Sequence, residues 1–438
     1  MAAGFIFNHN ECVSCGACRA ACIIENGWVV NPRMVYTFNS EAISSMPLVN
    51  ISLACNHCEK PTCLAGCPSG SYFRDEATGA IVINDNKCIG CKYCKWNCPY
   101  DSPKFDERKK VIVKCNLCYN GLKEGRMPAC TYACPTGALS FGDIREQVKE
   151  YIPEWFPDKD LNPAIKFSGK QNNLPVRIIP DKNINSETLS PQQENRFKSS
   201  LLSLVAFSFL STLSVALVIS SGIKGVFPDF TMLLILITIA TISSLFHLGK
   251  ITRAWRAIIN IRSSPLSLEI ALLALFSTLS LSGVYFEIPI LMIISSIEGL
   301  LFLISIDNVY DYAEKPKSSI PHSGKTFMSS LLVISFLSDT IIPLIFIAII
   351  KIGITFYKVI TTKLTDSFSM LRTIRLALLV ISTGSLLYNN SLNIMVIVIF
   401  LIGELLDRIL FYIDFDQLNI KTLIIKNLIT SENGKKGS

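Results

Sequence analysis

The sequence predicts a small α+β domain followed by an all-α bundle of transmembrane helices. Two observations carry this prediction. All 16 cysteines of the 438 residues lie before residue 135, while long apolar segments occupy most of the chain after residue 198. Hydrophobic residues make up 50% of the chain and charged residues only 17%, which is too apolar for a wholly soluble protein. Two chemically different halves are therefore joined in one chain, whose length exceeds that of one ordinary domain.

The run from Cys88 to Pro99 has the spacing C-x2-C-x2-C-x3-C-P, which is typical of ligands to a [4Fe-4S] cluster. Three further groups have related spacings, and Pro68 and Pro135 end two of them. Together the four groups use every cysteine: Cys12, Cys15, Cys18 and Cys22; Cys55, Cys58, Cys63 and Cys67; Cys88, Cys91, Cys94 and Cys98; Cys115, Cys118, Cys130 and Cys134. The pattern predicts a double ferredoxin-like domain with four [4Fe-4S] clusters.

Disulfides and structural zinc are the alternatives for so many cysteines. A C-x2-C pair within one tight turn has poor disulfide geometry. Two C-x2-C pairs also make a zinc ribbon, but zinc does not explain the middle cysteine of a C-x2-C-x2-C run or the prolines that end three groups. Iron–sulfur ligation therefore fits the spacing best.

By analogy with two-cluster ferredoxins, the fourth cysteine of each group is expected to serve a neighbouring cluster. The expected ligand sets are Cys12, Cys15, Cys18 with Cys134; Cys115, Cys118, Cys130 with Cys22; Cys55, Cys58, Cys63 with Cys98; and Cys88, Cys91, Cys94 with Cys67. The formal charge of +7 is offset in such a protein, because each oxidised cluster with four thiolates carries about two negative charges. The lysines among the cysteines are then compensation, and no surface indicates nucleic acid.

The domain organisation follows from the same contrast. Residues 1–144 form the predicted ferredoxin-like domain, with short strands at 80–84 and 111–113. Residues 145–197 are polar and proline-rich, and this composition indicates a linker, with a helical start at 143–151. Residues 198–414 form the predicted membrane anchor, and residues 415–438 a polar C-terminal tail.

The anchor contains seven apolar segments long enough to cross a bilayer. The segments are roughly 199–221, 230–249, 267–286, 289–308, 328–350, 372–389 and 392–413. The stretch 328–360 is either one overlong helix kinked at Pro343 or a pair of shorter helices, so eight spans remain open. Lysines and arginines are divided evenly between the two sets of loops, so they do not predict sidedness.

One stretch of the anchor is distinctive: His247 ends the second span and is followed by a basic loop with Arg253, Trp255 and Arg256. An ionisable group at membrane depth is a functional candidate, and an imidazole is able to accept a proton from a quinol hydroxyl near neutral pH. We expect His247 to face the last cluster across a short gap. Arg253 or Arg256 would stabilise a developing negative oxygen on the quinol, although membrane anchoring alone also explains these residues.

A second candidate lies in the last span, where Glu404, Asp407 and Arg408 share one helical face. Either they form an internal ion pair within the helix, or Glu404 contributes to a proton path or a quinone contact. Glu298 and Asp339 are further acids within the predicted spans. Transmembrane b haems usually need paired histidines, and His247 is the only histidine within the spans, so the sequence predicts no haem.

These residues resemble the dimethyl sulfoxide reductase family of molybdopterin oxidoreductases. The first 143 residues are similar to its four-cluster iron–sulfur subunit through the cysteine groups and through the motifs at 56–63, 98–100, 114–118, 125–130 and 134–139. The stretch from 198 is similar to its haem-free membrane anchor, with His-Leu-Gly at 247–249, Arg-Ala-Trp-Arg at 253–256 and Gly-Glu-Leu-Leu at 403–406. Asp407 stands where that family has a small residue.

The resemblance implies two subunits fused in one chain, an electron-transfer and anchor subunit of a respiratory complex. It implies menaquinol or ubiquinol as substrate, a separate molybdopterin catalytic subunit as partner, and the bacterial cytoplasmic membrane as location. The first ten residues do not resemble a signal peptide, and export on the partner's twin-arginine signal would place the ferredoxin half on the periplasmic side. Whether the protein alone counts as an enzyme is left open, because the terminal substrate reacts on the partner.

Three functions remain in view. The first is quinol oxidation near His247 with electrons passed to the partner. The second is the same path in reverse, reducing quinone with electrons from a dehydrogenase or a sulfur-compound oxidase. The third is a redox anchor or maturation protein without a quinone site.

Overall fold

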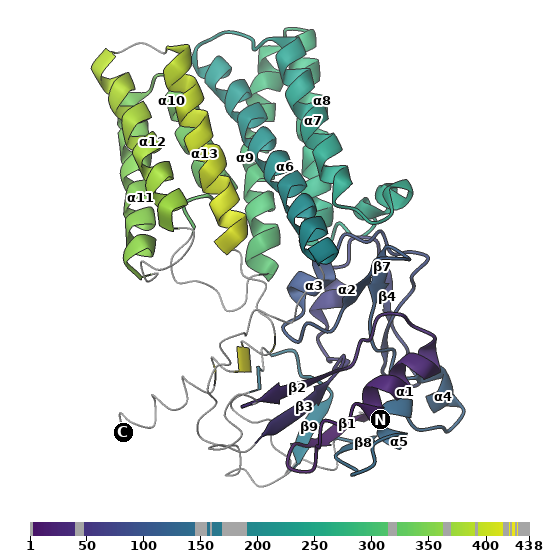
Figure 1. The fold of residues 1–438 in the computed structure, drawn as a ribbon. Helices are drawn as coiled ribbons and strands as arrows, with labels where there is room; N and C mark the ends of the chain where they lie inside the picture. The colour runs from purple at the N-terminus through teal and green to yellow at the C-terminus, as the bar shows by residue number, and fades with distance from the viewer. Residues whose placement is uncertain are drawn as a thin grey trace. The chain divides into compact units, whose positions relative to one another are not determined.

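The computed structural model describes residues 3–39, 48–144, 156–157, 160–168, 191–313, 322–361, 369–389 and 393–414, with residues 420, 423, 424 and 427. These residues belong to two compact units (Figure 1). The first comprises 1–191, 249–264 and 417–438, and the second comprises 192–248 and 265–416. The predicted helical start, apart from 143–144, and most of the linker and tail lie outside the described residues.

The first unit, here called the iron–sulfur unit, combines short strands and short helices, which agrees with the predicted α+β class. Its strands are β1 (Ala3–Asn8), β2 (Met34–Phe38), β3 (Val49–Leu53), β4 (Tyr72–Arg74), β5 (Ile81–Ile83), β6 (Lys104–Asp106), β7 (Val111–Val113), β8 (Leu139–Asp143) and β9 (Ile165–Ser168). Its helices are α1 (Ala17–Asn26), α2 (Thr62–Ala65), α3 (Tyr93–Asn97), α4 (Tyr119–Lys123), α5 (Ala129–Tyr132) and the 3-10 helix η1 (Ile251–Ile258). The strands predicted at 80–84 and 111–113 are confirmed as β5 and β7, whereas Asp143 ends β8 instead of starting a helix.

The central sheet of this unit has the strand order β8-β1-β9. β1 pairs antiparallel with β8 and parallel with β9, so the end of the ferredoxin-like sequence and part of the linker flank the first strand. Three hairpin-like pairs, β2-β3, β4-β5 and β6-β7, complete the strands. The cysteine groups lie in the turns and short helices between these strands.

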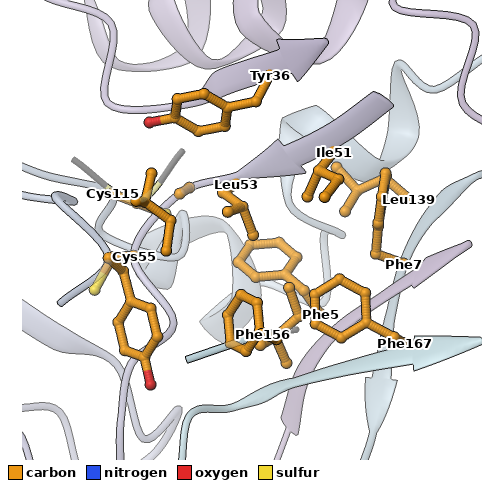
Figure 2. Packing of buried hydrophobic residues seen from close by; sticks show 14 of the residues in the cluster. Phe5, Phe7, Tyr36, Ile51, Leu53, Cys55, Cys115, Leu139, Phe156 and Phe167 are labelled. Atoms are coloured by element: carbon orange, nitrogen blue, oxygen red, sulfur yellow. The ribbon is translucent and has the colours of Figure 1, made fainter. Parts of the chain in front are cut away.

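The core of the unit is aromatic, and Figure 2 shows Phe5, Phe7, Phe156 and Phe167 packed together beneath β3 residues. The Phe156 and Phe167 rings lie 4.9 Å apart, so a piece of the predicted linker belongs to this core. Ile420 and Ile424 from the C-terminal segment are fully buried in the same cluster. The polypeptide therefore returns to the iron–sulfur unit after its last long helix.

The second unit, here called the helical unit, consists of eight helices among the described residues (Figure 1). They are α6 (Pro191–Ile223), α7 (Phe230–Phe246), α8 (Pro265–Tyr285), α9 (Pro289–Ala313), α10 (Thr326–Leu337), α11 (Ile341–Thr361), α12 (Ser369–Asn389) and α13 (Ile394–Asp414). Each predicted span coincides with one helix except 328–350, which is divided. The division falls at Ser338–Thr340, where Asp339 adopts a left-handed conformation with φ 58°. Pro343 lies in the first turn of α11, where its missing N–H has no helical partner to lose.

Within the part of the chain that the structure describes, four helices are long and apolar enough to cross a membrane by composition: α6, α8, α9 and α11, with α7 as a fifth if it is counted with η1. The predicted count of seven spans is not confirmed by this measure. Among the described helices, α10 has only 12 residues, about 18 Å of helix against a bilayer core of about 30 Å. α12 and α13 carry Arg372, Arg375, Glu404, Asp407 and Arg408, which lower their apolar character. The protein is thus an integral membrane protein whose last helices bury charge.

Candidate functional site

Each cysteine group begins with the same backbone turn. The second residue after the first cysteine adopts a left-handed conformation, and its N–H donates a hydrogen bond to the sulfur of that cysteine. The four residues are Ser14 (φ 56°) after Cys12, His57 (φ 44°) after Cys55, Gly90 (φ 70°) after Cys88 and Leu117 (φ 61°) after Cys115. Three of them are not glycine, and such conformations cost about 1–3 kcal/mol each and persist mainly at functional sites. Four copies of one strained turn indicate four equivalent sulfur sites.

Two cavities are each lined by four sulfurs from different parts of the chain. Cys12, Cys15, Cys18 and Cys134 line the first, and Cys55, Cys58, Cys63 and Cys98 line the second. Their empty volumes are about 330 and 320 Å³, including space open to solvent. Within the described ranges, no three His, Cys, Asp or Glu side chains could share one metal ion. The thiols therefore surround spaces larger than one ion.

The remaining eight cysteines form two further sets. Cys22 lies in electrostatic range of Cys115, Cys118 and Cys130, and Cys94 lies in range of Cys67, Cys88 and Cys91. Burial raises the pKa of the Cys22 thiol, and the neighbouring Cys115 raises it further. Burial likewise raises the pKa of Cys58, followed by Cys55 and Cys98. Grouped buried thiols ionise only with strong positive compensation, which iron supplies, so the donor sets fit [4Fe-4S] clusters.

Two buried cations lie among the thiols. Arg33 is 1% exposed, and its Nη1 donates to the hydroxyl of Ser52 at 3.1 Å. Burial lowers the pKa of Arg33, but the thiols of Cys130 and Cys115 outweigh it and raise the pKa overall. Lys114 is equally buried and donates to the carbonyls of Ile81 and Cys115. The lysines near the cysteines are recognisable in the sequence as compensation, but Arg33 is not, because it lies outside the four cysteine groups along the chain.

The loop after α7 belongs to the iron–sulfur unit. Residues 249–264, here called the docking loop, donate eight hydrogen bonds to backbone carbonyls of the turns that carry Cys67 and Cys88. The bonds are Gly249 N to Gly90, Lys250 N to Ile89, Arg253 Nη1 to Asp85 and Cys88, Asn260 N to Pro68, Asn260 Nδ2 to Ala65 and Cys67, and Ser264 Oγ to Gly66. A Cβ on Gly249 would clash with the carbonyl oxygen of Lys110, so only glycine fits there. The loop is fixed to one of the four sulfur sets.

His247 caps the C-terminal end of α7, two residues before the docking loop begins. The guanidinium of Arg253 donates hydrogen bonds to the backbone carbonyls of Asp85 and Cys88. Arg256 stacks on Trp255, with its guanidinium carbon 4.6 Å from the ring centroid, and Trp255 is 63% exposed. Of the two predicted arginines, Arg253 therefore binds the cysteine turns, whereas Arg256 lies on the exposed ring of Trp255.

Glu404 does not pair with Arg408 among the described residues, so the ion pair within the helix, one of the two alternatives for this face, does not form as expected. Its Oε2 lies 2.5 Å from Nζ of Lys351 on α11, and its Oε1 lies 3.9 Å from Arg375 on α12. Asp407 contacts both cations, at 3.1 Å and 2.7 Å. These four side chains, here called the ion quartet, are at most 2% exposed and balance two positive against two negative charges.

Arg408 lies beside the quartet in a different environment. Its Nε donates to the hydroxyl of Ser208 on α6 and its Nη1 to the carbonyl of Gly324, both at 2.7 Å. The guanidinium also lies over the rings of Phe411 and Tyr412. Arg408 therefore joins α13 to α6 by neutral partners.

The other acids of the helical unit also lie in different environments. Asp339 lies in the break between α10 and α11 and is half exposed, with its carboxylate 3.0 Å from Lys224. Glu298 is buried in α9, and neither carboxyl oxygen has a hydrogen-bond partner among the described residues. Glu269 on α8 is buried in electrostatic range of Arg408 and Asp307. Neither Glu269 nor Lys351 is recognisable as a buried site residue from the sequence, because a single acid or lysine carries no spacing pattern.

Comparisons with known proteins divide the chain in the same place. Residues 47–144 match the 4Fe-4S dicluster domain family, and residues 223–349 match the family of the DMSO reductase anchor subunit (DmsC). Lys351, Arg375 and Glu404 lie beyond both matches.

Curated relatives match the N-terminal part. A component of the anaerobic dimethyl sulfoxide reductase of Haemophilus influenzae is 36% identical over 159 residues, which are 34% of this chain and 77% of that protein. The Escherichia coli protein of the same name is 35% identical over 158 residues, with 34% and 77% covered. A component of the sulfite dehydrogenase of Allochromatium vinosum is 31% identical over 193 residues, with 39% and 76% covered.

Proposed function

Since the protein belongs to the family of dimethyl sulfoxide reductase iron–sulfur subunits, with the anchor subunit of those enzymes joined to it, we propose that it oxidises quinol in the membrane and passes the electrons through four [4Fe-4S] clusters to a separate catalytic subunit. The observation that carries the proposal is the gathering of sixteen cysteines into four crossed sets beside four identical turns. Each cluster, when bound, accepts and passes on one electron at a time. The cysteines hold the clusters, and the buried Arg33 and Lys114 offset their charge.

His247 is the proposed base of the quinol site. It lies two residues from the docking loop, and that loop is hydrogen-bonded to the turns of Cys67 and Cys88. Oxidation of a quinol releases two protons and two electrons, so the base and the first electron acceptor must lie near one another. This connectivity supports the set of Cys67, Cys88, Cys91 and Cys94 as the first acceptor. Arg256, which is not used by the cysteine turns, is the proposed partner for a developing negative quinol oxygen.

The proposed partner is a molybdopterin-bearing catalytic subunit that docks on the iron–sulfur unit. The relatives are themselves named as single components of multi-subunit enzymes, which supports a separate catalytic polypeptide. We place the protein in the bacterial cytoplasmic membrane with the iron–sulfur unit on the periplasmic side. Menaquinol or ubiquinol is the proposed substrate.

The same path in reverse is a second candidate. It is favoured by one observation, the 31% identity to a component of a sulfite dehydrogenase. In that case electrons would arrive from the catalytic subunit and reduce quinone at the same site. Midpoint potentials of the clusters relative to the quinone couple distinguish the two directions.

The iron content tests the proposed function. Purified protein is expected to hold about sixteen irons per chain, from four clusters of four. Electron paramagnetic resonance of the reduced protein should show interacting [4Fe-4S] centres, and quinol should reduce them. Zinc in place of iron, or about eight irons per chain, would contradict the four-cluster proposal, and iron-loaded protein that quinol fails to reduce would contradict the quinol site.

Replacement of Cys98 by serine tests the crossed ligation. Because Cys98 lines the cavity of Cys55, Cys58 and Cys63, the variant should lose or alter the cluster of that set. The signals of the set containing Cys88, Cys91 and Cys94 should stay as in the unaltered protein. Cluster-resolved paramagnetic resonance makes the measurement, with Cys67→Ser as the matched control that should affect the other set. An effect of Cys98→Ser on the Cys88 set would reject the crossing.

We propose eight membrane crossings, made by α6 to α13, in which the short α10 crosses together with the non-helical residues on either side of it. Two helices lead from the iron–sulfur unit to the docking loop, and six lead from that loop to the buried Ile420 and Ile424. Two and six are both even numbers of crossings. An even number is required each time the chain returns to the iron–sulfur unit on the same side of the membrane, whereas seven crossings would end on the opposite side. Polar groups of α12 and α13 are paired within the bundle, which supports spans that composition alone disfavours.

The proposed topology predicts where added tags become accessible. Epitope tags at the N-terminus and at the C-terminus should both be cleaved by protease in vesicles of one orientation and both be protected in the other. A tag in the 224–229 turn should show the opposite pattern and serves as the internal control. If the two terminal tags were cleaved in vesicles of opposite orientation, the result would contradict eight crossings.

A further inference from the structure

The eight hydrogen bonds described above between the docking loop and the cysteine turns run in one direction. In each of these eight the loop supplies the donor and a turn supplies a carbonyl oxygen. Four consecutive carbonyls, 65–68, surround Cys67, and three consecutive carbonyls, 88–90, follow Cys88. The arrangement polarises the peptide groups next to two sulfurs in the same sense.

One peptide group transmits this polarisation directly to a sulfur. The N–H of Lys250 donates to the carbonyl of Ile89 at 3.0 Å. The N–H on the other end of that same peptide, which belongs to Gly90, donates to the sulfur of Cys88. Hydrogen bonds in series strengthen one another, by about 10–30% per bond. The bond to the Cys88 sulfur is therefore stronger with the loop in place than without it.

The positive charge of Arg253 also favours negative charge on the Cys88 sulfur. The guanidinium of Arg253 donates to the carbonyls of Asp85 and Cys88 at 2.8 and 3.1 Å. The positive charge of Arg253 therefore lies beside the turn of Cys88, where it favours negative charge on the sulfur. Reduction of a cluster adds one negative charge. Hydrogen bonds to the sulfurs and nearby positive charge stabilise the reduced form and raise its potential.

We propose that the docking loop is a redox-tuning element, in which Arg253, Asn260 and the N–H of Lys250 raise the midpoint potential of the cluster held by Cys67, Cys88, Cys91 and Cys94. These are positioning residues, since they act through the peptide groups of the cysteine turns. The inference rests on the proposed function for its clusters. It assigns the loop a task beyond joining α7 to α8: making one cluster the favoured acceptor of the electrons released in the membrane.

Cationic side chains also reach two other cysteine carbonyls, since Arg74 donates to that of Cys58 at 2.8 Å and Lys114 to that of Cys115 at 2.7 Å. Two further cysteine carbonyls accept from neutral side-chain amides. The carbonyl of Cys22 accepts one amide hydrogen bond, from Asn26 at 3.0 Å, and the carbonyl of Cys12 accepts one from Asn50 at 2.8 Å. Neither amide is part of a cationic loop. Asn26 therefore provides a matched control, an asparagine that bonds to a cysteine carbonyl of a different set.

The test is a redox titration of Arg253→Gln, Asn260→Ala and Asn26→Ala, followed by paramagnetic resonance with each centre assigned. Arg253→Gln and Asn260→Ala should lower the midpoint potential of one centre, that of the Cys67 and Cys88 set, with the iron content unchanged. Arg253→Lys retains the charge and should recover part of the loss. Asn26→Ala should leave that centre at its original potential.

Unchanged potentials at that centre in both Arg253→Gln and Asn260→Ala would overturn the proposal. If Asn260→Ala loses one cluster while Arg253→Gln keeps every potential, the loop only holds the turns in place, and tuning is again rejected. Dithionite sets the potentials in this titration without quinol. A failure of quinol oxidation is therefore seen separately, as centres that titrate normally but are not reduced by quinol.

Discussion

Replacement of His247 by alanine is expected to slow quinol-dependent reduction of the clusters by about 10²-fold or more, the usual range for loss of a general base. The quinol hydroxyl must lose its proton as its electrons leave, and an imidazole at the end of α7 is suited to accept it near neutral pH. All four clusters should still assemble, because His247 belongs to the helical unit and not to the sulfur sets. Stopped-flow reduction by a quinol analogue gives the rate.

Two controls separate a lost base from a damaged protein. Dithionite should reduce the clusters of His247→Ala at the original rate, since it bypasses the quinol site. His322→Ala removes the other imidazole of the helical unit, which lies 3.1 Å from Asp414, and should leave the quinol-dependent rate nearly unchanged. A wild-type quinol rate in His247→Ala would move the site elsewhere, and Glu404 with Arg408 would become the next candidates.

Replacement of Lys351 by methionine is expected to destabilise the helical unit by about 3–5 kcal/mol, the usual cost of leaving a buried charge without its partner. The Lys351 ammonium is fully buried and contacts Glu404, Asp407 and the hydroxyl of Ser329. Its removal leaves two carboxylates with Arg375 as their one remaining cation among the described residues. Thermal and denaturant unfolding in lipid nanodiscs measures the loss.

A second substitution should restore part of this stability. Lys351→Met combined with Glu404→Gln returns the quartet to one positive and one negative charge, so the double variant should be more stable than Lys351→Met alone. Lys224→Met is the matched control, because Lys224 pairs with Asp339 at a similar distance but is 41% exposed. It should cost no more than ~1 kcal/mol. Equal losses for Lys351→Met and Lys224→Met would contradict a structural role for the quartet.

The sequence alone predicted the family, the α+β domain ahead of a helical membrane region, and the strands at 80–84 and 111–113. It could do so because ligand spacing is local: three of the four cysteines in each set lie close together in the sequence, and their spacing reflects the turn they form. Apolar segments are also local, since bilayer thickness sets their length. His247 could be predicted as a candidate for the same reason, because it stands at the end of an apolar segment.

Only the tertiary structure decided the partners. Glu404 had an arginine four residues away, yet it pairs with Lys351, 53 residues earlier, because facing helices bring the amine closer to the carboxylate. The docking loop lies between two apolar helices and resembles a membrane turn, but its hydrogen bonds join it to carbonyls about 160–200 residues earlier. Backbone carbonyls carry no sequence signal, since every residue has one. Ser14, His57 and Leu117 likewise gave no sign of their left-handed conformation, which the sulfur-binding turns impose on residues that do not prefer it.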